Sequence, residues 1–174
     1  MTTSILRKRK AVSPVIATVI LIAVAVALGI AVAFWASGLT SSFSKYEKLG
    51  VNTQFATLDS SCPSTLSGLK APCWTVNLGG QNTGSSDATI TQIQVNGVPI
   101  SATNAALTST PANSGTNGAI SIAVVSGGTF SIQFTLDSSG LAVSNAHTFT
   151  DGQTIQVTII TAAGNNYPAS IVLP

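Results

Sequence analysis

The sequence predicts an α+β protein, in which one long apolar helix near the N-terminus precedes an all-β domain. Residues 11–44 contain no charged side chain, although a run of cations from Arg7 to Lys10 stands directly before them. After Gly50 the pattern changes to short alternating runs separated by Gly, Asn, Ser and Pro, which is typical of strands and turns. The part after the helix, about 125 residues long, is large enough for a single domain with its own core.

The apolar segment is long enough to span a membrane. Residues 15–36 are apolar except for Thr18 and Gly29, and a helix needs about 20 such residues to cross the bilayer core. The cations before the segment keep that end in the cytoplasm, so the β domain is expected outside. Apolar side chains lie all round the helix and must be covered by lipid or protein. They include Val15, Ile16, Val19, Ile20, Ile22, Val26, Ile30 and Phe34.

Ser13 and Pro14 mark the expected start of this helix. A Ser side chain can cap free backbone N–H groups, and Pro at the first helical position loses no hydrogen bond. No Pro follows until Pro63, so the helix is expected to continue to residue 49.

Two other interpretations of the segment stay open at this stage. A secretory signal has a shorter apolar core, of about 7–15 residues, but the small residues around Ala36 would suit a cut there. A plain membrane anchor for an extracellular binding domain has the same length and charge asymmetry.

The strands of the β domain are predicted from alternating apolar residues and from turn signals. Asn96-Gly97 lies between two alternating runs and predicts a hairpin, and a second hairpin is expected over residues 153–173. Residues 101–118 are rich in Ser, Thr, Asn and Gly and are expected to form an exposed loop. About seven strands at this spacing suggest two packed sheets. Residues 120–124 and 130–136 are expected as another strand, turn and strand around Gly127-Gly128. The expected strands at 74–78 and 130–136 direct Trp74, Val76, Leu78, Phe130, Ile132, Phe134 and Leu136 inward.

Cysteine usage and the lack of catalytic motifs exclude several classes of function. Cys62 and Cys73 are the only cysteines, and outside the cytoplasm a disulfide between them is expected. A metal site would need more ligands, and His147 is the sole histidine. Asp137 and Asp151 precede turn residues without the ligand spacing of a calcium loop. We therefore expect no enzyme activity, no metal and no cofactor.

The charge balance gives no indication of a nucleic-acid partner. Charged residues make up 7% of the chain, against about 25% in a typical soluble domain. Without the four N-terminal cations, three Lys remain against five Asp and Glu, so the remainder carries a side-chain charge of minus two. No Asn begins an Asn-x-Ser/Thr triplet, so N-linked glycosylation is not expected.

The junction between the cations and the helix resembles a known family. The string Lys-Ala-Val-Ser-Pro-Val-Ile-Ala-Thr-Val-Ile-Leu, from Lys10 to Leu21, is similar to the class III signal peptide and N-terminal helix of archaeal type IV pilins. The resemblance implies that a prepilin peptidase cuts at a site comprising Lys10, Ala11 and Val12, between Ala11 and Val12. Residues 1–11 would be removed, and residues 12–49 would be the transmembrane and filament-core helix.

The family's architecture implies the remaining expectations. Residues 50–174 would form an extracellular domain similar to the immunoglobulin-like sandwiches of archaeal pilins and archaellins. A cytoplasmic ATPase and a membrane platform would move subunits from the cytoplasmic membrane into a helical homopolymer on the cell surface. The string from Ser13 to Thr18 is more similar to adhesion-type pilins, and an archaellin of a swimming filament is the alternative within the same machinery.

Overall fold

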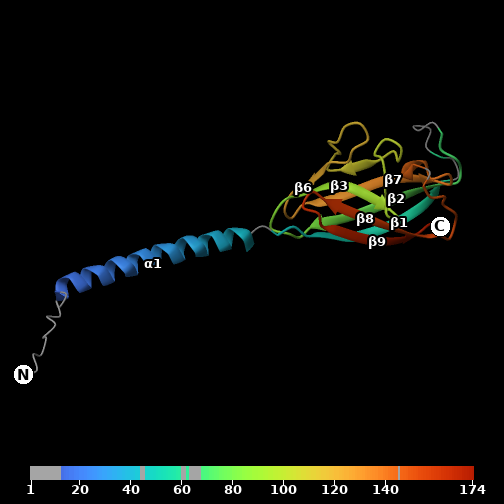
Figure 1. Cartoon of the computed structure of the whole chain (residues 1–174). Coiled ribbons are helices and arrows are strands. Elements are labelled where there is room, and N and C mark those ends of the chain that lie inside the picture. Colours follow the sequence, from blue (N-terminus) through green and yellow to red (C-terminus); the bar gives the residue numbers. More distant parts are fainter. Residues whose placement is uncertain (1–12, 44–45, 60–61, 63–67, 145) are drawn as a thin grey trace, which may run out of the picture. The chain divides into compact units, whose positions relative to one another are not determined.

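The computed structural model describes residues 13–43, 46–59, 62, 68–144 and 146–174. The chain divides into two units, Met1–Ser44 and Lys45–Pro174 (Figure 1). The first unit contains the helix α1, Pro14–Phe43, and the second contains the β strands. The predicted order of one apolar helix followed by a β-rich region is confirmed.

Helix α1 begins where the sequence predicted and ends earlier than expected. The Ser13 carbonyl accepts hydrogen bonds from the backbone N–H groups of Ile16 (3.0 Å) and Ala17 (3.1 Å), which places Ser13 at the N-terminal boundary. The predicted end at residue 49 is wrong, because the helix ends at Phe43. Residues 46–48 are non-helical, and Leu49 already belongs to the first strand.

The second unit consists of two antiparallel sheets. The first has the strand order β1-β2-β7-β5, and the second has the order β4-β3-β8-β9, with β6 also paired to β3. A short 3₁₀ helix, η1, follows β7. The elements are β1 Leu49–Asp59, β2 Cys73–Asn82, β3 Ala88–Val95, β4 Val98–Pro99, β5 Thr108–Thr110, β6 Ile122–Val124, β7 Thr129–Asp137, η1 Leu141–Val143, β8 Thr154–Thr161 and β9 Asn166–Val172.

Two of the three predicted strand–turn–strand units are present as hairpins. Strands β3 and β4 pair around Asn96 and Gly97, whose φ angles of 50° and 83° are those a tight primed turn requires. Strands β8 and β9 pair throughout, from Thr154 opposite Val172 to Ile160 opposite Asn166. Local turn chemistry was therefore sufficient to predict these two pairings.

Three elements differ from the sequence-based expectation. Strand β1 was not predicted, because its polar run from Asn52 to Gln54 lies on an edge strand and lacks clear alternation. The expected strands at 120–124 and 130–136 exist, but β6 pairs with β3 whereas β7 pairs with β2 and β5. The expected loop at 101–118 contains the short strand β5.

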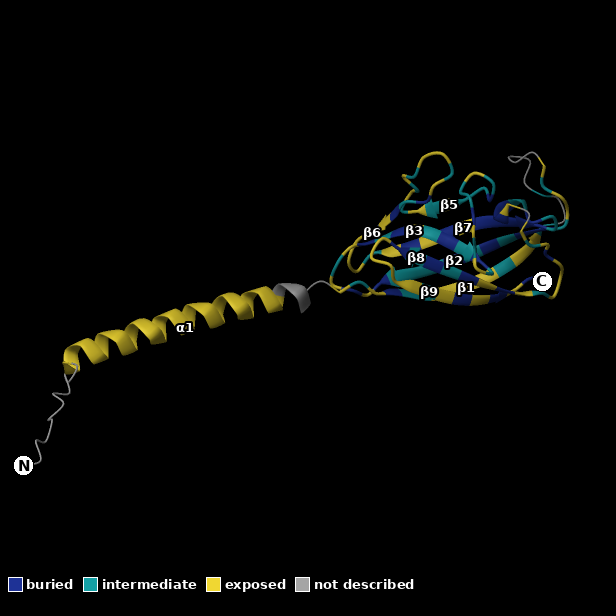
Figure 2. Cartoon of the chain, viewed as in Figure 1, coloured by how far each residue is buried: buried dark blue, intermediate teal, exposed yellow. Residues whose placement is uncertain are grey.

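The inward faces of the two sheets share one hydrophobic core. All seven inward side chains expected from β2 and β7 are at least 97% buried, and they pack with residues of β3, β8 and β9. Figure 2 shows these buried segments along the middle of the strands. The β unit therefore satisfies its own apolar surface.

A disulfide closes the connection between β1 and β2, as expected. Cys62 and Cys73 are bonded with a Cα–Cα distance of 5.3 Å and a sequence separation of 11. Cys73 is fully buried at the first position of β2. The bond therefore ties the incoming loop to the sheet.

Candidate functional site

The apolar surface of α1 is the main feature that the fold leaves uncovered. Its large apolar side chains are between 43% and 75% exposed, and Figure 2 shows exposure along the helix. The most apolar 18 residues within Pro14–Thr40 have a mean hydropathy of 3.0, and the segment is by length and composition suited to crossing a membrane. The exposed large side chains of α1 are Val15, Ile16, Val19, Ile20, Leu21, Ile22, Val24, Val26, Leu28, Ile30, Val32, Phe34, Trp35 and Leu39.

Three hydroxyl groups of the helix, those of Thr18, Ser37 and Thr40, form hydrogen bonds to the helix's own carbonyls. Thr18 Oγ1 donates to the Val15 carbonyl at 2.8 Å, and Thr40 Oγ1 donates to the Ala36 carbonyl at 2.9 Å. Ser37 Oγ donates in the same way to the Phe34 carbonyl at 3.0 Å. Because these three hydroxyls are satisfied within the helix, they can enter lipid or a protein core without an unpaired donor.

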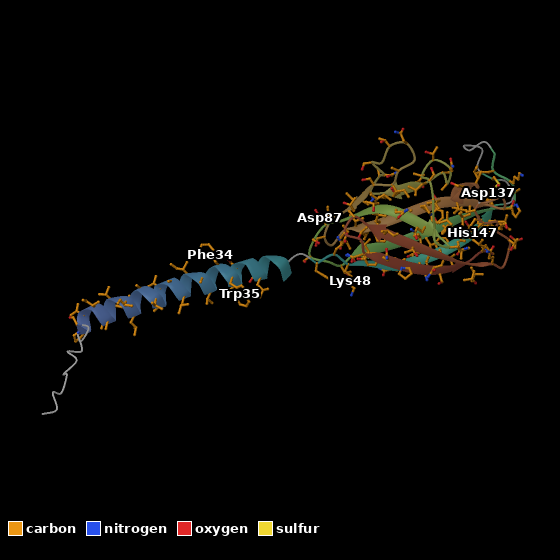
Figure 3. All side chains as sticks on the ribbon, in the orientation of Figure 1. Phe34, Trp35, Lys48, Asp87, Asp137 and His147 are labelled. Carbon is orange, nitrogen blue, oxygen red and sulfur yellow. A yellow bond between two sulfur atoms is a disulfide. The ribbon has the colours of Figure 1, made fainter. Side chains whose placement is uncertain are left out.

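Small residues occur along much of the helix, and one series of them is regularly spaced. Ala25, Gly29, Ala33 and Ser37 recur at intervals of four residues and therefore lie on one face. A Cβ placed on Gly29 would meet no other atom within 4 Å. Small residues at this spacing allow helix backbones to approach closely in an apolar environment. Phe34 and Trp35 project from neighbouring positions (Figure 3).

The segment that follows the helix is bound to the β unit by backbone hydrogen bonds. The Tyr46 carbonyl accepts from the N–H groups of Ser85 (2.8 Å) and Ser86 (3.2 Å), and the Tyr46 N–H donates to Ser85 Oγ at 3.0 Å. The Lys48 carbonyl accepts from the Thr83 N–H at 2.7 Å. Residues 46–48, which we call the junction segment, are therefore held against the turn after β2.

A buried asparagine organises that turn. Asn82 is fully buried, and its Nδ2 donates to the carbonyls of Ser86 (2.9 Å) and Val124 (3.1 Å). Its Oδ1 accepts from the Gly84 N–H at 3.0 Å. A Cβ on Gly84 would collide with the Tyr46 carbonyl oxygen, so only glycine permits this close approach.

A second set of contacts joins the junction segment to the β8–β9 hairpin. Glu47 Oε2 accepts hydrogen bonds from Thr161 Oγ1 and Asn165 Nδ2, each at 2.9 Å. The Tyr167 hydroxyl donates to the Glu47 carbonyl at 3.4 Å. The junction segment is thus fixed to both sheets, which the sequence did not predict. The turn residues at 82–85 were recognisable, but their distant partners were not.

Of the residues considered for metal binding, Asp137 has a structural role in a turn. Lys48 and Asp87 lie at one end of the β unit, and Asp137 and His147 lie at the other (Figure 3). The buried Asp137 carboxylate accepts from the N–H groups of Leu141 (2.7 Å) and Lys70 (3.2 Å). Among the described residues, no group of three or more His, Cys, Asp or Glu is placed to hold a metal ion.

The structure describes most of the predicted site residues, although not the proposed cleavage site. Lys10, Ala11 and Val12 lie outside the described residues. Ser13 and Pro14 begin the helix, and the eight residues assigned to its apolar surface, from Val15 to Phe34, are all exposed.

Comparison with known proteins gives no family assignment. No protein-family model matches the chain, and no curated protein matches it significantly.

Proposed function

We propose that this protein is the structural subunit of an archaeal type IV adhesion pilus, polymerising through α1 with the β unit on the filament surface. The observation that carries the proposal is the contrast between the two units. The β unit buries its own core, whereas α1 exposes apolar side chains from Val15 to Leu39. Covering each large side chain contributes on the order of 1 kcal/mol, which favours association of the helix with lipid or with other helices.

A helical polymer would use this surface twice. Before assembly, lipid covers the helix in the cytoplasmic membrane, and after assembly neighbouring helices cover it. The internally satisfied hydroxyls of Thr18, Ser37 and Thr40 suit both environments. The face containing Gly29 gives neighbouring backbones room to approach.

Processing at the junction of Ala11 and Val12 would precede assembly. The string from Lys10 to Leu21 supports a prepilin peptidase site there. The helix begins at Pro14, so the proposed cut lies just before its first turn. The assembly ATPase and the membrane platform are the other proposed partners.

The strand order supports an immunoglobulin-like topology for the β unit. In immunoglobulin domains, strands A, B, E and D form one sheet and strands C, F and G form the other, to which variable-type domains add C′. The order β1-β2-β7-β5 corresponds to A-B-E-D, and β4-β3-β8-β9 corresponds to C′-C-F-G. Strand β6 is an addition to this plan, and the disulfide lies between β1 and β2 instead of joining the two sheets.

The junction segment provides mechanical continuity within the proposed subunit. Its carbonyl groups and the Glu47 side chain bind residues from the turn after β2 and from the β8–β9 hairpin. A load that reaches residue 46 is therefore distributed over both sheets.

The experiment that tests polymerisation places one charge on the helix. Ile20 is 55% exposed near the middle of the apolar segment, and an Asp there costs about 2.5–3.5 kcal/mol in a membrane. The remaining segment is apolar enough to insert, so Ile20→Asp is expected in the membrane fraction without filaments. Ser170→Asp, on the exposed side of β9, is the matched control and is expected to form filaments. A wild-type protein that stays in the membrane and forms no filament would support a plain anchor and contradict the proposal.

A further inference from the structure

The outward face of the first sheet is a continuous polar surface. Its cross-strand rows follow from the pairing register of β1, β2, β7 and β5. One row contains Phe55, Asn77, Gln133 and Thr108. The next contains Thr53, Gly79, Ser131 and Thr110. These two rows lie beside each other on the same side of the sheet, because side chains two residues apart share a face.

This face is hollowed at the second row. Gly79 has no side chain where its neighbours carry Thr53 and Ser131, and the depression over it has a volume of about 420 Å³. A smaller depression of about 190 Å³ shares Asn77 and Ser131 with it and extends to β5. We call the two together the sheet groove. The larger part falls within the range of about 300–1,000 Å³ that small-ligand sites occupy.

The sheet groove is lined mainly by uncharged polar side chains. No residue lining it is charged, and amide and hydroxyl side chains predominate. Within the part of the chain that the structure describes, the side chains of Asn52, Thr53, Thr129 and Ser131 form no hydrogen bond. Their donors and acceptors are therefore available to a ligand. Asn77 Nδ2 donates to the Thr75 carbonyl at 3.5 Å, and Gln133 Oε1 accepts from Thr108 Oγ1 at 3.4 Å. The other amide atom of each side chain, Asn77 Oδ1 and Gln133 Nε2, is available as well.

One aromatic ring borders the sheet groove. Phe55 is 47% exposed and lies directly opposite Asn77. An exposed ring beside an amide offers an apolar face next to hydrogen-bonding groups. This combination matches a sugar ring, which has an apolar C–H face and a rim of hydroxyl groups.

We propose that the sheet groove binds a neutral carbohydrate, with one sugar ring stacked on Phe55 and its hydroxyls bound by Asn77, Ser131 and Gln133. The lack of charge selects against anionic polysaccharides, because no cation on this surface would compensate their carboxylate or sulfate groups. The three polar residues project from β2 and β7, which are central strands of the sheet and hold them in fixed positions.

Binding is measured on the full chain in detergent micelles, where the subunit need not be polymerised. The probes are the neutral polysaccharides laminarin, dextran and mannan, with alginate as the anionic comparison, and the readout is isothermal titration calorimetry. At least one neutral probe is expected to bind, and alginate is not. Phe55→Ala is expected to raise the Kd about tenfold, which corresponds to the loss of a ring contact. Asn77→Ala is expected to raise it about fivefold.

The controls lie on the other sheet. Val172→Ala removes an exposed apolar side chain from the edge strand β9, and Gln156→Ala removes an exposed amide from β8. Both are expected to bind as the wild type does, and circular dichroism of all variants is expected to be unchanged. Binding that is unaffected by Phe55→Ala and Asn77→Ala would overturn the proposal.

A different occupant would give a different result. If no neutral probe binds and Phe55→Ala instead disrupts filament order, the sheet groove contacts a second copy of the chain, and the carbohydrate assignment is wrong. The monomeric assay keeps the two proposals separable, because Ile20→Asp removes filaments and is expected to leave binding in micelles intact. Loss of binding in that variant would place the ligand elsewhere.

Discussion

Replacing Asn82 by Ala tests the role assigned to the turn that holds the junction segment. The substitution removes two donated hydrogen bonds, to the carbonyls of Ser86 and Val124, and one accepted from the Gly84 N–H. Because Asn82 is fully buried, water does not replace the hydrogen bonds that these backbone groups lose. Each such loss costs about 1–3 kcal/mol, which gives about 3–9 kcal/mol for three. Because the hydrogen bond to the Ser86 carbonyl is only partly buried, the total destabilisation is expected in the lower part of that range, at about 3–5 kcal/mol.

The measurement is thermal and urea unfolding of the full chain in detergent micelles, followed by near-ultraviolet circular dichroism. For a domain of this size, about 4 kcal/mol lowers Tm by roughly 10–15 °C. Asn52→Ala is the matched control, because Asn52 is exposed on β1, and its effect is expected within about 0.5 kcal/mol of zero. If the free energy of unfolding of Asn82→Ala were less than about 1 kcal/mol below that of the wild type, the reasoning would be refuted.

Three further predictions concern the stability of the β unit and use the same unfolding assay. Replacing both Cys62 and Cys73 by Ser is expected to cost about 3 kcal/mol, because the unfolded chain regains the freedom of the loop that the disulfide closes; no difference between the variant and the wild type under oxidising conditions would contradict this. Gly80→Ala is expected to cost about 1–3 kcal/mol, because its Cβ would collide with the Gly50 carbonyl and lie 2.7 Å from the Phe130 ring. An unchanged Tm would show that β1 and β2 can move apart here without loss of stability. Asp137→Asn is expected to cost about 2–3 kcal/mol. The carboxylate now accepts hydrogen bonds from backbone N–H groups, and the NH₂ group of the introduced amide would face some of these donors. A neutral effect would mean that this turn rearranges around the amide.

The long-range arrangement of the β unit depended on contacts that the sequence does not reveal. The Asn96-Gly97 turn fixed the β3–β4 hairpin, because φ angles above zero are required there. By contrast, β6 and β7 are close in sequence but belong to different sheets. Alternation in each strand identifies its inward face but not its partner, so the separation between β6 and β7 could not be predicted.

The apolar helix was the most predictable part of the candidate site, since its length and composition are properties of the sequence alone. Its end was less predictable. The helix stops at Phe43 and not at 49, and the junction segment beyond it forms backbone hydrogen bonds with residues after β2. Glu47 binds Thr161 and Asn165, more than 110 positions away. Such pairs arise only from the completed fold.

The sheet groove shows the same limitation. Nothing in the sequence distinguishes Gly79 or Phe55. The two residues line the same depression only because β1 pairs with β2. Because β1 was not predicted, neither was the surface that it completes.

The measurement that most directly tests the account is N-terminal sequencing and intact mass of the protein sheared from the cell surface, together with electron microscopy of the same material. The account predicts filaments whose subunits begin at Val12 and retain α1. Protein beginning at Met1, confined to membranes without filaments, would contradict the proposed function and favour a simple anchor. A start near Ser37 would show that the apolar segment is removed as a secretory signal and would contradict it equally.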